Sequence, residues 1–191
     1  MSDGFGKFLV ICALIALSAC QDKHSDVREL IDDIALPASC RQLLVVTTET
    51  WDSNGGTLSI LYRDDSDGWR LQNSHDVVIG RSGLAWGRGV HEFGEGSEKV
   101  EGDGRAPAGV FTIGDAFGYG EEPGDLKINY RQATEHDYFV DDVESADYNQ
   151  WARFDGDPKT RWKSFERMRR DDARYEFGAI VNHNMSPIEP G

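Results

Sequence analysis

The sequence predicts a mainly β domain, a sandwich or barrel-like fold with long loops and one or two short helices. Three observations lead to this prediction. Short runs of alternating apolar and polar residues begin at residue 41, turn signals separate those runs, and helical periodicity is confined to two short stretches. Hydrophobic residues make up 39% of the 191 residues, which is enough for a core and too many for a disordered chain.

The N-terminal segment has the pattern of an export signal. Lys7 precedes the uninterrupted run FLVICALIALSA at residues 8–19. A run of about 12 residues is too short to span a bilayer as a helix and has the length of a signal-peptide core. A buried helix of the fold is the alternative interpretation of the same residues.

The end of that run resembles a bacterial lipobox. In LSAC, the cysteine is Cys20, and a lipobox cysteine is acylated and becomes the mature N-terminus. We therefore expect residues 1–19 to be a lipoprotein signal peptide and residues 20–40 a lipidated tether with a short helix. The protein is expected to be exported and anchored by lipid on the periplasmic side of a bacterial membrane. Gln21 after the cysteine favours the outer membrane.

Charge and cysteine content limit the possible partners. The formal net charge is −14, and nucleic acid is not an expected partner because phosphate binding depends on Lys and Arg. Of the three cysteines, Cys12 belongs to the predicted signal, Cys20 is expected to take lipid, and Cys40 remains alone. Cys40 is either a nucleophile or a small residue at the start of a strand. Because no His lies within ten residues of it, the second interpretation is favoured.

Local patterns place the first elements of the domain. A short helix is expected over residues 25–37, where apolar residues recur on one face and a proline closes the segment. Four strand segments follow, at residues 42–51, 57–63, 69–72 and 75–80. The sequence DDSDG, just before the third of these, resembles the start of a calcium loop. A hairpin turn is favoured, because the twelfth position is Ser74 where a calcium loop needs Glu.

The second half of the chain is expected to be richer in loops. Residues 80–109 are rich in glycine and predict a long surface loop, after which residues 110–113 re-enter the sheet. The acidic residues 121–160 are expected to be irregular, without a spacing that fits metal ligands. A helix is predicted over residues 160–172, with Trp162, Phe165 and Met168 facing inward, and the last strand over residues 175–184.

Generic catalytic motifs do not identify a reaction. The sequence contains no phosphate-binding P-loop, hydrolase elbow, zincin motif or kinase motif. No cofactor and no metal site is therefore predicted.

Five sequence blocks, taken together, resemble the catalytic domain of the L,D-transpeptidases. In order along the chain they are GRSGLAWGRG, EGDGRAPAGVFTIGDAFGYG, VDDVESADYNQ, SFERMRRDD and YEFGAIVNHNMSPIEPG. Their order and spacing fit the family from residue 42 to residue 191, so residues 41–191 are expected to form an L,D-transpeptidase-like β-sandwich with a catalytic cleft.

The family resemblance implies a particular reaction. L,D-transpeptidases cross-link peptidoglycan stem peptides: a Cys thiolate attacks the tetrapeptide donor, and the acyl group passes to an amine or to water. A His activates the Cys, and backbone N–H groups form the oxyanion hole. The implied partner of this protein is accordingly the peptidoglycan stem peptide.

The resemblance can be carried over to individual residues only in part. It places the family's catalytic His and Cys beyond Gly191, so we expect the chain to be truncated before its final catalytic strands, with no catalytic residue of its own. Phe139 stands where relatives can have a Cys, so a disulfide there is not expected. The residues that match motif positions are Arg81, Gly102, Asp103, Arg105, Pro107, His183 and Asn184.

The matched residues have both functional and structural interpretations. Arg81, Asp103, Arg105, His183 and Asn184 are candidates for the wall of a substrate cleft. Turn geometry accounts for the matched glycines and proline, and Asp103 is expected to form a salt bridge with Arg105 that holds the loop. For His183, orientation of cleft residues and a buried hydrogen bond remain equally open.

Two functions follow from the sequence. The first is a lipid-anchored L,D-transpeptidase that lacks its catalytic segment and is inactive as given. The second is a non-catalytic envelope lipoprotein or stem-peptide-binding module. Whether the protein is an enzyme is therefore open at this point.

Overall fold

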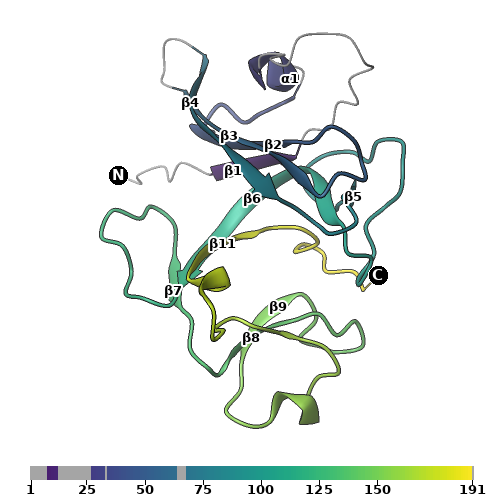
Figure 1. Ribbon diagram of the computed structural model, residues 1–191, viewed down its shortest axis with the longest axis vertical. Helices are drawn as coiled ribbons and strands as arrows, with labels where there is room; N and C mark the ends of the chain where they lie inside the picture. Colours follow the sequence, from purple (N-terminus) through teal and green to yellow (C-terminus); the bar gives the residue numbers. More distant parts are fainter. Residues whose placement is uncertain (1–7, 13–26, 33, 64–67, 191) are drawn as a thin grey trace. The chain divides into compact units, whose positions relative to one another are not determined.

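A computed structural model describes residues 8–12, 27–32, 34–63 and 68–190 (Figure 1). Within them the structure is mainly β, as predicted, with one α-helix and two short 3₁₀ helices. The chain divides into an N-terminal unit, Met1–Ile113, and a C-terminal unit, Gly114–Gly191.

The N-terminal unit is built on one twisted sheet. Its strand order is β6-β1-β2-β3-β4, and β5 pairs with the start of β6. Strand β1 lies between β2 and β6, parallel to the first and antiparallel to the second (Figure 1). The strands are β1 (Phe8–Cys12), β2 (Gln42–Thr47), β3 (Gly55–Arg63), β4 (Trp69–Val78), β5 (Leu84–Trp86) and β6 (Ala106–Gly118).

Strands β3 and β4 form an antiparallel hairpin. Arg63 pairs with Trp69, which confirms antiparallel strands on either side of the DDSDG segment; residues 64–67 lie outside the described residues. The prediction of two separate strands after this turn is wrong, because β4 is continuous. A register shift at Ile60 and Leu61 keeps the longer strand paired along its whole length.

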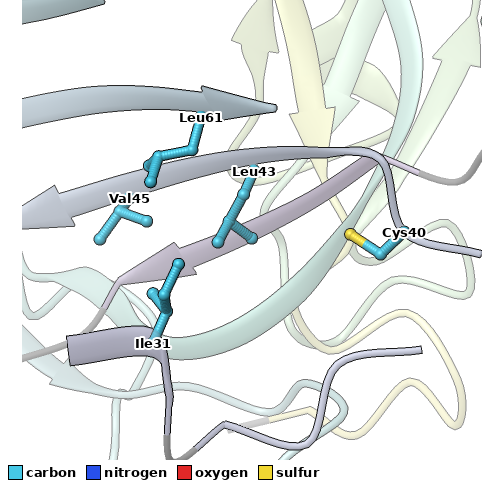
Figure 2. Packing of buried hydrophobic residues seen from close by; sticks show 5 residues of the cluster. All are labelled: Ile31, Cys40, Leu43, Val45 and Leu61. Atoms are coloured by element: carbon cyan, nitrogen blue, oxygen red, sulfur yellow. The ribbon is translucent and has the colours of Figure 1, made fainter. Parts of the chain in front are cut away.

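Helix α1, Val27–Asp32, packs on this sheet and supplies part of its core. It confirms the helix predicted over residues 25–37, over a shorter span. Ile31 is its anchor, with 2% of its surface exposed, and burying one such side chain stabilises the fold by about 1.5–3 kcal/mol. Figure 2 shows the cluster that Ile31 joins, which consists of Ile31, Cys40, Leu43, Val45 and Leu61.

The glycine-rich segment before β6 is mostly irregular, as predicted. It is interrupted only by the three-residue strand β5, and β6 begins earlier than expected, at Ala106. The re-entry of the chain into the sheet at residues 110–113 is confirmed, because Val110 and Phe111 pair with β1.

The C-terminal unit contains a small three-stranded sheet and two further strands that pair with β6. The small sheet has the order β10-β8-β9, while β7 and β11 pair with β6. Residues 121–160 therefore contain ordered strands, and the prediction of an irregular segment is wrong there; the predicted last strand is present as β11. The elements are β7 (Tyr130–Gln132), β8 (Asp137–Val140), β9 (Gln150–Arg153), η1 (Pro158–Thr160), β10 (Glu166–Arg167), η2 (Ala173–Tyr175) and β11 (Phe177–Val181).

The predicted helix over residues 160–172 is also wrong. The Lys163 N–H donates to the Asp142 carboxylate at 2.8 Å, and the Met168 N–H donates to a carbonyl of β8 at 2.9 Å. These long-range acceptors replace the i−4 carbonyls that a helix would use. Trp162 and Met168 still face inward, at 2% and 5% exposed. The spacing of these residues therefore predicted their burial correctly, although the segment does not form a helix.

Asp137 is the polar centre of the C-terminal unit. Its carboxylate is 2% exposed and accepts hydrogen bonds from Thr134, Trp151 and Arg153 at 2.6–3.1 Å. Burial by itself raises the pKa of Asp137, but the hydrogen bonds from Arg153, Thr134 and Trp151 outweigh it and lower the pKa to about 2. The group is thus a buried anion that holds β8 and β9 together.

The structure bears only in part on the predicted export segment. Cys20 and the cleavage region lie outside the described residues, whereas residues 8–12 of the predicted signal form strand β1. Across the described ranges, no helix combines the length and the apolar character needed to cross a bilayer.

Candidate functional site

Three of the five predicted cleft residues lie together in the N-terminal unit. Arg105 stands directly before β6, where its guanidinium donates to the Leu84 carbonyl at 2.8 Å and to the Asp52 carboxylate at 2.9 Å. A longer contact of 3.4 Å reaches the Trp51 carbonyl. Arg105 therefore ties the β2–β3 turn to β5 and the start of β6, and its guanidinium is engaged in contacts within the protein.

Asp103 closes the turn that precedes Arg105. Its carboxylate accepts the backbone N–H groups of Arg105 at 2.8 Å and Val100 at 3.0 Å, and it pairs with Lys99 at 2.9 Å. The predicted Asp103–Arg105 salt bridge is therefore wrong: Asp103 binds the backbone of Arg105, and Lys99 supplies the cation. Burial raises the pKa of Asp103, but the hydrogen bonds from Arg105, Lys99 and Val100 lower it below its ordinary value.

Arg81 covers the same turn from outside. Its guanidinium lies over Gly104, where an added Cβ would approach to within 2.8 Å, and it reaches the Gly102 carbonyl at 3.5 Å. Both glycines have positive φ, +77° and +72°, which supports the turn-geometry interpretation of these matched positions. Arg81 is exposed, so of the three residues it is the one that presents its charge to solvent.

An aromatic cluster beside this turn was missed from the sequence. Trp86 lies between Trp51 and His91, with ring centroids 5.4 Å and 5.7 Å away, and the His91 ring contacts Phe111 edge-on at 5.5 Å. The His91 ring lies against Gly109, where an added Cβ would come within 2.0 Å of it. The available signal was the presence of aromatic residues within a glycine-rich segment.

His91 is fixed by the backbone of β6. The Val110 N–H donates to its Nδ1 at 3.0 Å, while Nε2 is buried without a hydrogen-bond partner in the described part of the chain. The same Nδ1 also lies 3.2 Å from the Val110 carbonyl, so both backbone polar groups of Val110 face this ring nitrogen. We interpret His91 as a packing residue that shapes the glycine-rich segment.

The other two predicted cleft residues lie in the C-terminal unit, after β11. Asn184 is 6% exposed and has φ of +53°; its side chain donates to the Glu189 carbonyl at 2.7 Å and accepts the Glu189 N–H at 3.0 Å. The Asn149 side chain donates to the carbonyls of His183 and Asn184 at 3.0 Å and 2.7 Å. The two asparagines thus fix the path of the chain after β11, and His183, which precedes Asn184 in the sequence, is half-buried.

Cys40 does not have the surroundings of a nucleophile. It is 2% exposed, belongs to the core of the N-terminal unit (Figure 2), and its thiol donates to the Gln42 carbonyl at 3.4 Å. Burial raises its pKa, more than the nearby Arg63 and Arg41 lower it. Since the thiolate is the reactive form, these contacts agree with the interpretation of Cys40 as a small residue at the start of a strand.

Within the described ranges, acidic, cysteine and histidine side chains do not gather into a metal site. No group of three or more His, Cys, Asp or Glu residues suited to a metal ion occurs in the ranges that the structure describes. The His136 ring lies 3.4 Å from the Glu135 carboxylate and 3.7 Å from the Asp155 carboxylate, and both carboxylates are exposed to solvent.

Comparisons with protein-family models, with curated proteins and with solved structures found no match for this chain.

Proposed function

We propose that the protein is an envelope lipoprotein of the L,D-transpeptidase type, with a mainly β, L,D-transpeptidase-like sandwich that binds peptidoglycan stem peptides. One observation carries the proposal: the block EGDGR folds into a closed turn at the start of β6. In that turn the side chains of Asp103 and Arg105 form hydrogen bonds with other residues of the protein. Arg81 lies over the turn with its charge exposed to solvent. Such a turn has the character of a preorganised recognition element.

Within this proposal Arg81 is the residue that contacts substrate. Stem peptides carry free carboxylates, and a guanidinium binds a carboxylate through paired hydrogen bonds. Asp103 and Arg105 are positioning residues, because they set the turn against which Arg81 lies. We expect His183 and Asn184 to contribute a separate contact surface within the C-terminal unit, through the ordered chain after β11.

Transpeptidation of this type requires a reactive thiolate as the nucleophile. A thiolate adds to the stem-peptide carbonyl, the leaving D-alanine amine takes up a proton, and a second amine then displaces the thiolate to form the cross-link. Cys40 is not the nucleophile of this scheme, because its thiol is buried and its pKa is raised. Within the proposal, the described residues are assigned to recognition of the stem peptide, and Cys40 is not assigned a part in acyl transfer.

Binding of a soluble disaccharide-tetrapeptide tests the proposal. Calorimetric titration of the full chain should show binding, and Arg81→Ala should weaken it by at least about tenfold, the loss of one charged hydrogen-bonded contact. Arg81→Lys should retain part of the affinity. Arg70→Ala, at an exposed arginine on β4, is the matched control and should bind normally. Undetectable binding by the wild type, or equal binding by Arg81→Ala, would refute the proposal.

A non-catalytic stem-peptide-binding module is the second candidate, and the burial of Cys40 favours it. Incubation of the full chain with a carbapenem, which acylates L,D-transpeptidase cysteines, tests by intact mass whether any cysteine of this chain acts as a nucleophile. No adduct on the full chain, together with binding of the disaccharide-tetrapeptide, is the result expected of a binding module. An adduct mapped to Cys40 would contradict the structural role assigned to that residue.

The lipid anchor is tested separately. Cells that express the protein with labelled palmitate should yield a labelled band, and Cys20→Ala should abolish the label. Equal labelling of both proteins would rule out acylation at Cys20, and the location on the periplasmic side of a membrane would lose its main support.

A further inference from the structure

Strand β1 occupies an inner position of the N-terminal sheet. It pairs with β2 from Phe8↔Gln42 to Ile11↔Val45, and with β6 from Leu9↔Thr112 to Cys12↔Gly109 (Figure 1). Both edges of this short apolar strand are therefore used. The same residues lie inside the segment that the lipobox predicts to be removed.

The strands on either side of β1 are held by other contacts. Strand β2 pairs with β3 from Gln42↔Tyr62 to Thr47↔Thr57. The start of β6 pairs with β5, and it is tied to the β2–β3 turn through Arg105 and Asp52 at 2.9 Å. A further bond, from the Leu84 N–H to the Trp51 carbonyl at 2.7 Å, fixes β5 to the same turn.

These contacts act against closure of the sheet without β1. For β2 and β6 to pair directly, they would have to approach by one strand spacing, about 4.8 Å. That movement would disturb the contacts between the β2–β3 turn and the start of β6. The sheet is consequently built to hold the two strands one strand apart.

The gap that β1 fills is lined by the backbone hydrogen-bonding groups of β2 and β6, and the strands on both sides of it carry buried apolar side chains. Leu43 and Val45 on β2 and Phe111 on β6 have no exposed surface. Without a strand between them, the facing N–H and C=O groups of β2 and β6 would lose their partners, which is costly in an apolar environment. A suitable occupant is extended, because it must supply backbone groups along both edges. It is also uncharged and apolar, because its neighbours on both sides are fully buried apolar residues.

We propose that the gap between β2 and β6 is a strand-binding site, which β1 fills in the precursor and which an apolar peptide segment of another polypeptide fills once residues 1–19 are removed. The bound segment runs parallel to β2 and antiparallel to β6 and spans at least the four residue pairs that β1 makes with each. This is β-augmentation at an inner position of a sheet. The inference rests on the proposed export of the protein.

A full-length variant opens the site without truncation. Pro has no N–H and is not accommodated in an inner strand, so Val10→Pro should expel β1 from the sheet. Amide exchange at residues 43–45 and 110–112 should then be at least about tenfold faster than in the wild type. A labelled peptide, Lys-Phe-Leu-Val-Ile-Ser, should bind the variant and restore slow exchange. The same peptide with an N-methylated Val should not, and the wild type, whose site is occupied, should bind neither.

A second experiment covers the case in which Val10→Pro fails to fold. A specific protease site inserted between Ala19 and Cys20 allows the folded full chain to be cut in solution. The released N-terminal segment should remain bound and then exchange for the labelled peptide, as followed by size-exclusion chromatography.

Three results would overturn the inference. The first is slow amide exchange in the opened chain without peptide, which means that β2 and β6 close on each other. The second is fast exchange that the peptide does not slow. The third is concentration-dependent protection with a dimer, which assigns the gap to a second copy. None depends on the disaccharide-tetrapeptide titration, so failure of the strand site and failure of the proposed substrate are separately visible.

Discussion

Asp137→Asn should destabilise the C-terminal unit, and the loss should depend on pH. The carboxylate is 2% exposed and accepts five hydrogen bonds from Thr134, Trp151 and Arg153. An amide of the same shape presents an NH₂ group to donors that need an acceptor, and it removes the negative charge that faces Arg153. At least one donor is then left without a partner inside the unit.

The magnitude follows from the pKa of Asp137. A folded pKa of about 2 against an ordinary value of 3.8 corresponds to roughly 2 kcal/mol of stability at neutral pH. Arg153 is 61% exposed, so solvent screening makes this an upper value for the ion pair itself. Because the folded pKa is the lower one, the stabilisation is fully present above about pH 4 and is lost as the pH falls through about 2.

Urea unfolding followed by tryptophan fluorescence provides the measurement. At about pH 7 the variant should be less stable than the wild type by roughly 2 kcal/mol, and the difference should shrink as the pH approaches about 2. Asp155→Asn is the matched control, since the Asp155 side chain is 88% exposed and should contribute little. A difference that stays constant from neutral pH to about pH 2 would show that packing, and not the charge of Asp137, is what the substitution removes.

Three further predictions concern the N-terminal unit. Arg105→Ala should lower the free energy of unfolding by about 1–3 kcal/mol in urea titrations, whereas Asp52→Ala, at a side chain 80% exposed, should cost less than about 1 kcal/mol. Gly109→Ala should cost more than about 2 kcal/mol, because φ is +131° and the new Cβ meets a ring at 2.0 Å, while Gly102→Ala, at φ of +77° in open space, should cost only about 1 kcal/mol. Alkylation of Cys40 by iodoacetamide should be at least about tenfold slower in the native protein than in urea, and equal rates would contradict its burial.

Much of the fold follows from local patterns, whereas a contact between residues far apart in the chain explains the wrongly predicted helix. Alternation of apolar and polar residues located β2, β3, β11 and the entry into β6, and helical spacing located α1. The predicted helix over residues 160–172 failed because the Lys163 N–H binds Asp142, 21 residues earlier in the chain. An acceptor at that separation leaves no periodic trace in the sequence, although the burial of Trp162 was readable from its spacing.

The candidate site shows the same division between local and distant partners. The i,i+4 spacing of Lys99 and Asp103 is visible in the sequence, and the pair is present at 2.9 Å. The real partner of Arg105 is Asp52, which lies 53 residues away and could not be chosen from many acidic residues. Proximity in sequence therefore favoured the wrong partner for Arg105, while the turn itself was placed correctly.

The pair of indole rings in the N-terminal unit has an optical consequence. Trp51 and Trp86 lie with centroids 5.4 Å apart and planes inclined by 59°, an arrangement in which their electronic transitions couple and produce a paired band in circular dichroism. Trp51 belongs to the β2–β3 turn and Trp86 to β5, so the band depends on the same contacts that Arg105 maintains. The protein thus carries an intrinsic chromophore pair whose signal reports, without any added label, whether these two segments remain together.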